Sequence, residues 1–393
     1  MSAFGRALLG AWDLDPSVVY LNHGTVGAVP RRVLAKAERI RRDVERQPSR
    51  YLLRELAAIR VGGPRAEAPR LRRAADLVGA FLGVDGGDLA FVDNATTGIN
   101  AVLRSLPFRE GDEILLFDHG YGAIALAASY VARERGASVR AVAVPYPPFD
   151  PAALLDGLAA ALTPRTRLAI LDHVTSESAL LLPIHEMTAI CRERGVPVLV
   201  DGAHAPGAID LDIDAIGADW YAGNLHKWAW SPRSCGVLWA APDRQAGIHP
   251  PVISWGLDQG FTTEFDWVGT RDPAPFLAAP EGIAMMREMG VDAVHRYTHG
   301  LARGAARLLA SRWGTSVPAP ESAIATMATV PLPERAGRAP EDATRLRDAL
   351  LEEDRIEAQI HAWRERLWVR ISAQVYNETG DYERLADAVA GRI

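Results

Sequence analysis

The stretch VLVDGAHAPGAIDLDIDAIGADWYAGNLHKW, residues 198–228, opens with a run of apolar residues that ends at Asp201. A short apolar run closed by polar and small residues is typical of a strand that is buried on both faces. Lys227 stands near the end of the stretch, directly before Trp228, although the 393-residue chain contains only one other lysine, Lys36. Because an amine in an apolar, partly desolvated setting has a lowered pKa and is nucleophilic, we expect Lys227 to act through its amine.

The sequence around this stretch alternates apolar runs with segments of helical periodicity. Strands are expected at 88–94, 112–119, 138–145, 167–174 and 196–201. Helices are expected between them at 96–106, 121–136, 150–163 and 183–195, with Asp150 as an N-cap and Gly136 at a C-terminus. Repetition of strand, helix and strand implies a mostly parallel sheet with helices on both faces, and therefore an α/β fold.

The periodicity changes after about residue 276. Helical segments at 280–289 and 294–313 lead into short strand-like segments such as RLWVRISAQVY, residues 366–376. We therefore predict a smaller α+β domain with an antiparallel sheet. The predicted regions are an N-terminal arm and helix at 1–70 that contribute to the small domain and the active-site mouth, a large domain at 71–275, and a small C-terminal domain at 276–393.

The composition excludes several classes of function. The net charge of −6, with both signs dispersed along the chain, argues against a nucleic-acid partner. No apolar run approaches the roughly 18 residues that a membrane span needs, and the N-terminus does not resemble a signal peptide. The two cysteines, Cys191 and Cys235, offer no metal-binding spacing and no disulfide framework. We expect a cytoplasmic protein that binds a small molecule and no metal.

Polar residues follow each expected strand, at the edge of a parallel sheet where ligands bind. These segments are Asn94-Ala95-Thr96-Thr97, Asp118-His119-Gly120-Tyr121, Asp172 to Ser176, Asp201 to His204, and Asn224 to Lys227. Small and hydroxyl residues that open a helix, such as Thr96 and Thr97, form an anion site because free N–H groups point outward there.

One cofactor requires this whole set of groups. Pyridoxal 5'-phosphate (PLP) needs a lysine for its Schiff base, a carboxylate at its pyridinium nitrogen, an anion site for its phosphate and a ring stacked on its face. Lys227, Asp201 and the segment with Thr96 and Thr97 supply the first three groups. We therefore predict that PLP is the cofactor.

Several segments carry a resemblance to a known family. VDGAHAPG (200–207) and NLHKW (224–228) resemble the class V aminotransferase superfamily of fold-type I PLP enzymes. With VYLNHGTVGAVP (19–30), GTRDP (269–273) and VRISAQVYN (369–377), the chain is most similar to the isopenicillin N epimerase-like branch. The resemblance implies the PLP-dependent transferase fold, with a mostly parallel seven-stranded sheet in a large domain and a small α+β C-terminal domain.

The resemblance also implies roles for individual residues around the cofactor. Lys227 matches the Schiff-base lysine and Asp201 the partner of the pyridinium nitrogen. The residues implied to hold the phosphate are Ala95, Thr96, Thr97 and His226. His204 and Ser176 match residues near the phenolic oxygen, and His119 matches the ring-stacking residue, with Tyr121 as the alternative.

On the substrate side, Arg370 resembles the arginine that binds the substrate carboxylate, and its planar fork suits that role. Asn22, His23 and Gly24 resemble the segment that lines the substrate. Thr270 resembles a residue that reaches the phosphate of the other subunit, which implies a homodimer.

The reaction itself stays open among several outcomes. The resemblance favours epimerisation at the Cα of an amino acid or amino-acid conjugate in natural-product metabolism. C–S cleavage by β-elimination, decarboxylative deamination of a cysteine-derived thioether, transamination and a catalytically inactive binding protein are alternatives. Epimerisation needs a second acid or base, for which His119, Tyr121 and His23 are candidates. Desulfuration through a persulfide is excluded, because VRISAQVYN contains no cysteine.

Overall fold

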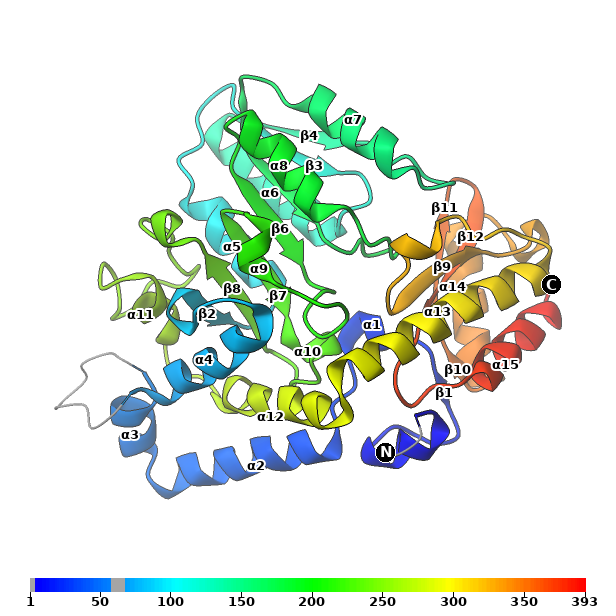
Figure 1. The fold of residues 1–393 in the computed structure, drawn as a ribbon, viewed down its shortest axis with the longest axis horizontal. Helices are drawn as coiled ribbons and strands as arrows, with labels where there is room; N and C mark the ends of the chain where they lie inside the picture. Colours follow the sequence, from blue (N-terminus) through cyan, green and yellow to red (C-terminus); the bar gives the residue numbers. More distant parts are fainter. Residues whose placement is uncertain (1–3, 58–67) are drawn as a thin grey trace.

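A seven-stranded, mostly parallel sheet forms the centre of the computed structural model, which describes residues 4–57 and 68–393 (Figure 1). From edge to edge its strands are β2 (Leu89–Val92), β8 (Gly236–Ala240), β7 (Trp220–Asn224), β6 (Val198–Gly202), β5 (Thr166–Asp172), β3 (Glu113–Phe117) and β4 (Ser138–Val142). Within this sheet β8 runs antiparallel to both of its neighbours, and the other strands are parallel to one another. The predicted α/β fold is confirmed.

Helices cover both faces of this sheet. On one face lie α5 (Ala95–Ser105), α6 (Gly122–Arg135) and α11 (Phe261–Asp266). The opposite core includes α2 (Arg31–Arg46), α4 (Arg70–Leu82), α7 (Pro151–Ala161), α8 (Ile184–Glu193) and α12 (Ala274–Met289). Along β5, Leu168 and Ile170 join the α5 side, whereas Ala169 and Leu171 join the α8 side. Burial of both faces explains why the parallel strands are continuously apolar.

The predicted helix ends are present in the structure. The Asp150 carboxylate accepts hydrogen bonds from the N–H groups of Ala152 and Ala153 at the start of α7. Gly136 closes α6 with a φ of 69°, a left-handed conformation that glycine adopts at little cost. The short helices are α1 (His23–Val26), α3 (Pro48–Arg50), α9 (Ile213–Ile216) and α10 (Leu225–Trp228).

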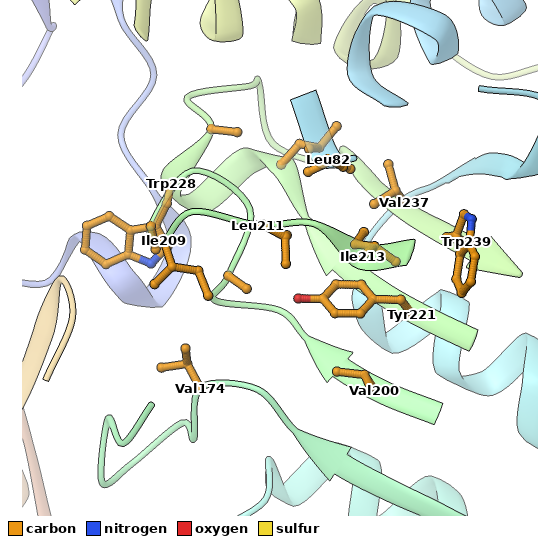
Figure 2. Packing of buried hydrophobic residues seen from close by; sticks show 14 of the residues in the cluster. Leu82, Val174, Val200, Ile209, Leu211, Ile213, Tyr221, Trp228, Val237 and Trp239 are labelled. Carbon is orange, nitrogen blue, oxygen red and sulfur yellow. The ribbon is translucent and has the colours of Figure 1, made fainter. Parts of the chain in front are cut away.

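The segment that follows β6 packs back onto the sheet. Leu211 and Ile213 lie beside Tyr221 of β7, and Ile209 lies beside Trp228, in one apolar cluster (Figure 2). A β-carbon at Gly202 would lie 2.1 Å from the Tyr221 ring, so the strand after Asp201 approaches this ring as closely as only glycine allows. This packing fixes the end of β6 and, with it, the position of Asp201.

The C-terminal part contains an antiparallel sheet in the order β11 (Gln359–Trp363), β12 (Arg366–Ser372) and β9 (Met327–Pro331). Its core includes α13 (Val291–Trp313), α14 (Pro340–Glu352) and α15 (Thr379–Ala390). In addition, β1 (Val19–Tyr20) pairs in parallel with β10 (Ile356–Glu357), which ties the N-terminal arm to this part. The predicted small α+β unit is therefore present.

The exact division into domains stays a prediction. α12 begins at Ala274, and its residues Phe276 and Ile283 belong to the same core as α2 and α4. The core of the C-terminal part takes in Val19 and Leu21 of the N-terminal arm, and its next residue along the chain is Ala302 of α13. Residues 1–3 and 58–67 of the predicted N-terminal region lie outside the described residues. Within the described ranges, no helix combines the length and the apolar character needed to cross a membrane.

Candidate active site

Lys227 lies on α10, a one-turn helix that follows β7 directly. Its Nζ is 3.2 Å from His204 Nε2, and its main-chain carbonyl is 2.8 Å from His23 Nε2. The pKa of the Lys227 amine is lowered to about 7, first by burial and then by the positive charge of Arg370, while the Asp201 carboxylate acts in the opposite direction. The amine is therefore neutral in a large fraction of molecules near pH 7.

A cavity of about 490 Å³ opens beside Lys227 at the carboxyl ends of β5, β6 and β7. We call it the cofactor cavity. The predicted site residues that line it are Ala95, Thr96, Thr97, Tyr121, Ser176, Asp201, His204, His226 and Lys227. The other lining residues are Asn94, Asp172, Val174, Ala203 and Asn224, from the strand-end segments expected at this edge, and Thr25 and Ala123, which the sequence did not single out.

The N-terminus of α5 forms one end of this cavity. Asn94 caps the helix by accepting a hydrogen bond from the Thr97 N–H at 2.9 Å. Asn224, at the end of β7, accepts one from the Ala95 N–H at 2.8 Å, and this contact is buried. A helix N-terminus attracts anions through its outward N–H groups and the helix dipole. The sequence placed both asparagines at element ends, but only the fold shows that Asn224 braces the turn before Thr96.

Two carboxyl groups lie side by side at the floor of the cofactor cavity. Asp172 of β5 and Asp201 of β6 are register partners, and both are buried. Burial raises the pKa of both groups, and the negative charge of Asp201 raises that of Asp172 further. The Ala203 N–H, which donates to Asp201 at 3.0 Å, and the charge of Lys227 lower the pKa of Asp201.

These residues fit PLP. A buried carboxylate is costly unless it is paired, and a protonated pyridine nitrogen would give Asp201 a positively charged hydrogen-bond donor. The α5 N-terminus with Thr96 and Thr97 suits a phosphate, and Lys227 supplies the amine in the same cavity. The Nδ1 atom of His204 is buried without a hydrogen-bond partner among the described residues, so a polar group is expected beside it.

His119 and Tyr121 are separated by the fold, although they are two residues apart. Tyr121 precedes α6, is 49% exposed and lines the cofactor cavity. His119 does not line it: its Nδ1 is 2.9 Å from Ser178 Oγ, and its ring lies edge-on to Tyr146 and Trp363 in a neighbouring cavity. The geometry therefore favours Tyr121 over His119 as the ring beside the cofactor.

Arg370 of β12 reaches a second cavity of about 320 Å³, which we call the carboxylate cavity. Arg370 Nη1 donates to the Ser176 carbonyl at 2.7 Å and Nη2 to Thr25 Oγ1 at 2.6 Å. Its Nε is buried and has no partner among the described residues, and burial lowers its pKa to about 10. Lys227 lines both cavities, so the amine and the guanidinium face a common space.

The three residues predicted to line the substrate, Asn22, His23 and Gly24, have different surroundings in the structure. Gly24 lines the carboxylate cavity, and its N–H donates to Ser372 Oγ at 2.9 Å. His23 is fully buried, and its Nδ1 lies 2.8 Å from the Tyr376 hydroxyl, so it supports the chain of Lys227 rather than facing a ligand. The Asn22 amide donates to Glu357 and lines neither cavity.

Thr270 is exposed in the loop between α11 and α12. It lines neither of the two cavities around Lys227. Its predicted contact is with a second copy of the chain, so that role stays a prediction.

The cysteines take no part in this site. Cys191 and Cys235 are buried, and burial raises the pKa of each thiol to about 12. Neither of them lines the cofactor cavity or the carboxylate cavity. No thiolate is therefore placed to attack a bound substrate.

The fold and the site define a PLP-dependent enzyme of fold type I. The chain belongs to the class-V aminotransferase family, whose sequence model matches residues 45–385. This membership confirms the resemblance seen in the segments around Asp201 and Lys227.

Among its relatives is the isopenicillin N epimerase of Streptomyces clavuligerus, which is 36% identical over 396 residues, with 97% of this chain and 96% of that protein covered. A probable chloroplastic L-cysteine desulfhydrase of Arabidopsis thaliana is 32% identical over 408 residues, covering 96% of this chain and 84% of that protein. Relatives of comparable identity thus carry names of different reactions.

A solved structure with the same fold is that of a cystine C–S lyase in complex with its reaction product, cysteine persulfide. It matches with a TM-score of 0.77 and 22% identity, over 95% of this chain and 97% of that chain. In a variant of the same lyase, glycine is covalently linked to the PLP cofactor. At this identity the likeness concerns the fold alone.

Proposed function

We propose that this enzyme epimerises an amino acid or amino-acid conjugate at Cα, in natural-product metabolism. The observation that carries the proposal is that Lys227 and Tyr121 both line the cofactor cavity and the carboxylate cavity. They come from different elements, α10 and the start of α6. Epimerisation needs one group that removes a proton and another that returns it from the opposite side, and both side chains can carry a proton.

The proposed roles around the cofactor follow from this arrangement. Asp201 pairs with the pyridinium nitrogen, and Tyr121 lies against the ring. The phosphate is bound by Ala95, Thr96, Thr97 and His226, with Thr270 of a second copy in a homodimer. Ser176 and His204 lie near the phenolic oxygen. A location in the cytoplasm is part of the same proposal.

PLP, when bound, supplies an electron sink that makes the Cα proton of an amino acid acidic. Arg370 binds the substrate carboxylate through its guanidinium fork and holds Cα near Lys227. The neutral amine of Lys227 takes the proton from one side, and the hydroxyl of Tyr121 donates one from the other. Lys227 then loses its extra proton to water and Tyr121, half exposed, regains one, so the enzyme returns to its starting state.

C–S cleavage is the second candidate. The similarity to a probable L-cysteine desulfhydrase favours it, and β-elimination needs Lys227 but no second acid on the far side. Decarboxylative deamination of a cysteine-derived thioether is a further outcome, for which Arg370 would have to release the carboxylate.

The test is to incubate the PLP-loaded enzyme in D2O with L-amino acids and cysteine S-conjugates. Proton NMR reports deuterium at Cα, and chiral chromatography reports optical purity. Epimerisation predicts deuteration together with loss of optical purity. Release of a thiol with pyruvate and ammonia would refute it in favour of C–S cleavage, and release of carbon dioxide with an aldehyde would indicate decarboxylative deamination.

Two variants sharpen this test. Tyr121→Phe should retain deuteration at Cα, because Lys227 is intact, but should keep the product optically pure. Tyr130→Phe is the matched control, since Tyr130 is an exposed tyrosine of α6 that lines neither cavity. Loss of optical purity that survives Tyr121→Phe would remove Tyr121 from the mechanism.

A further inference from the structure

A third cavity, of about 220 Å³, adjoins the carboxylate cavity. Gly120, Gly122 and Glu177 line both, so these residues lie at the border between the two spaces. We call it the aromatic cavity. The aromatic cavity lies between two parts of the chain. One part is the set of loops that follow β3, β4 and β5, and the other is the three-stranded sheet of the C-terminal part. At ~30 Å³ per water molecule, it has room for about seven waters.

Aromatic rings form one wall of this cavity. The ring centroids of Tyr146, Trp363 and Trp368 are 5.6 to 5.7 Å apart, and His119 lies edge-on to Tyr146 at 5.3 Å. Tyr146 and Trp368 are buried, whereas Trp363 is partly exposed. Such rings form a rigid surface that favours planar and apolar groups.

Three polar atoms of the lining residues are buried without a hydrogen-bond partner among the described residues. They are His119 Nε2, His361 Nδ1 and the Tyr146 hydroxyl. An unpaired buried polar group costs roughly 1–3 kcal/mol, so three of them around one cavity indicate a missing polar partner. The His119 ring is held by its Nδ1 contact with Ser178, which leaves Nε2 as the free position.

These three groups are themselves uncharged. The cavity is also lined by Glu177 and by Asp118, whose carboxylate accepts a hydrogen bond from the Val144 N–H at 2.8 Å. Burial lowers the pKa of His361 to about 4 and also lowers that of His119, so both imidazoles are neutral near pH 7. Burial raises the pKa of Tyr146, which keeps its hydroxyl protonated and able to donate. Arg364 is engaged on the Trp363 ring and on the Tyr146 carbonyl, to which it donates at 2.8 Å.

We propose that the aromatic cavity binds the side arm of the substrate amino acid, and that this arm ends in a planar, uncharged group with a hydrogen-bond acceptor. The inference rests on the proposed function in one respect, which is that Arg370 binds the α-carboxylate. With the carboxylate there, an arm that passes Gly120 and Glu177 enters the aromatic cavity.

The test uses α-methyl amino acids, which have no Cα proton and therefore bind without deprotonation. The probes are the α-methyl forms of alanine, S-benzylcysteine, S-(2-pyridylmethyl)cysteine and S-(2-aminoethyl)cysteine. Dissociation constants for the PLP-loaded enzyme are measured at pH 8 by tryptophan fluorescence. The benzyl and pyridylmethyl probes have the same shape and differ by one ring nitrogen, so their comparison isolates the hydrogen bond.

The pyridylmethyl probe should bind more than tenfold tighter than α-methylalanine, and about two- to tenfold tighter than the benzyl probe. Tyr146→Phe should remove the preference for pyridylmethyl over benzyl, while Trp363→Ala should weaken both and leave α-methylalanine unchanged. Tyr130→Phe is the control and should change none of the constants.

Equal affinity for long-armed and short probes would overturn the inference, and so would tighter binding of the aminoethyl probe than of the pyridylmethyl probe. A loss of affinity for α-methylalanine in Trp363→Ala as large as that for the long probes would also overturn it. Turnover of the parent amino acids is measured separately. If none reacts but the affinities follow the expected order, the proposed function fails and the side-arm cavity stands.

Discussion

The pKa of Lys227 can be measured directly, because Lys36 and Lys227 are the only lysines in the chain. An ordinary lysine, with a pKa of about 10.5, is neutral in roughly one molecule in 3,000 at pH 7. A pKa of about 7 makes Lys227 neutral in about half of the molecules. The difference corresponds to roughly 5 kcal/mol against the charged form, and its main cause is burial of the amine.

Two charge-removing variants should move this pKa in opposite directions. The positive charge of Arg370 lowers the pKa of Lys227, so Arg370→Met should raise it. The negative charge of Asp201 raises it, so Asp201→Asn should lower it. The amine should therefore become neutral at higher pH in the first variant and at lower pH in the second.

The assay is an NMR titration of the apoprotein after reductive methylation with ¹³C-formaldehyde. The methyl signals of the two lysines and of the N-terminal amine report protonation, and Lys227→Arg identifies the signal of Lys227 by its loss. We expect the Lys227 signal to titrate near pH 7. A midpoint near pH 10 in the unmodified sequence, or a shift in the same direction in both charge variants, would refute the reasoning from burial and charge.

Three further predictions concern binding and stability. Asn224→Ala leaves the buried Ala95 N–H without its acceptor, so the affinity of the apoprotein for PLP, measured by absorbance titration, should fall by roughly tenfold; an unchanged affinity would contradict the bracing role. Asp150→Ala removes the N-cap of α7 and should lower the free energy of unfolding by about 1 kcal/mol in urea denaturation without changing PLP affinity, which makes it the control for Asn224→Ala. Gly202→Ala places a β-carbon 2.1 Å from the Tyr221 ring and should destabilise the fold by about 3 kcal/mol, seen as a lowered Tm. A normal Tm in that variant would mean that the ring moves aside freely.

Local patterns in the sequence were sufficient for the parallel sheet and for half of the candidate site. Strands such as β5 and β6 are recognisable because burial on both faces requires continuous apolar runs. Asp201 lies at the end of β6, Thr96 and Lys227 follow strand ends, and the ends of parallel strands meet at one edge. Their presence around one cavity was therefore predictable from order along the chain.

Only the tertiary structure decided the remaining contacts, because packing between distant elements leaves no periodic trace in the sequence. Arg370 reaches Ser176 and the space around Lys227 through the position of β12 against the large sheet. The fold also separates His119 from Tyr121, since Ser178 and the aromatic wall hold the His119 ring away from the cofactor cavity. The sequence by itself thus determined the fold class and the cofactor chemistry, and the packing of the two sheets decided which side chains line the cavities around Lys227.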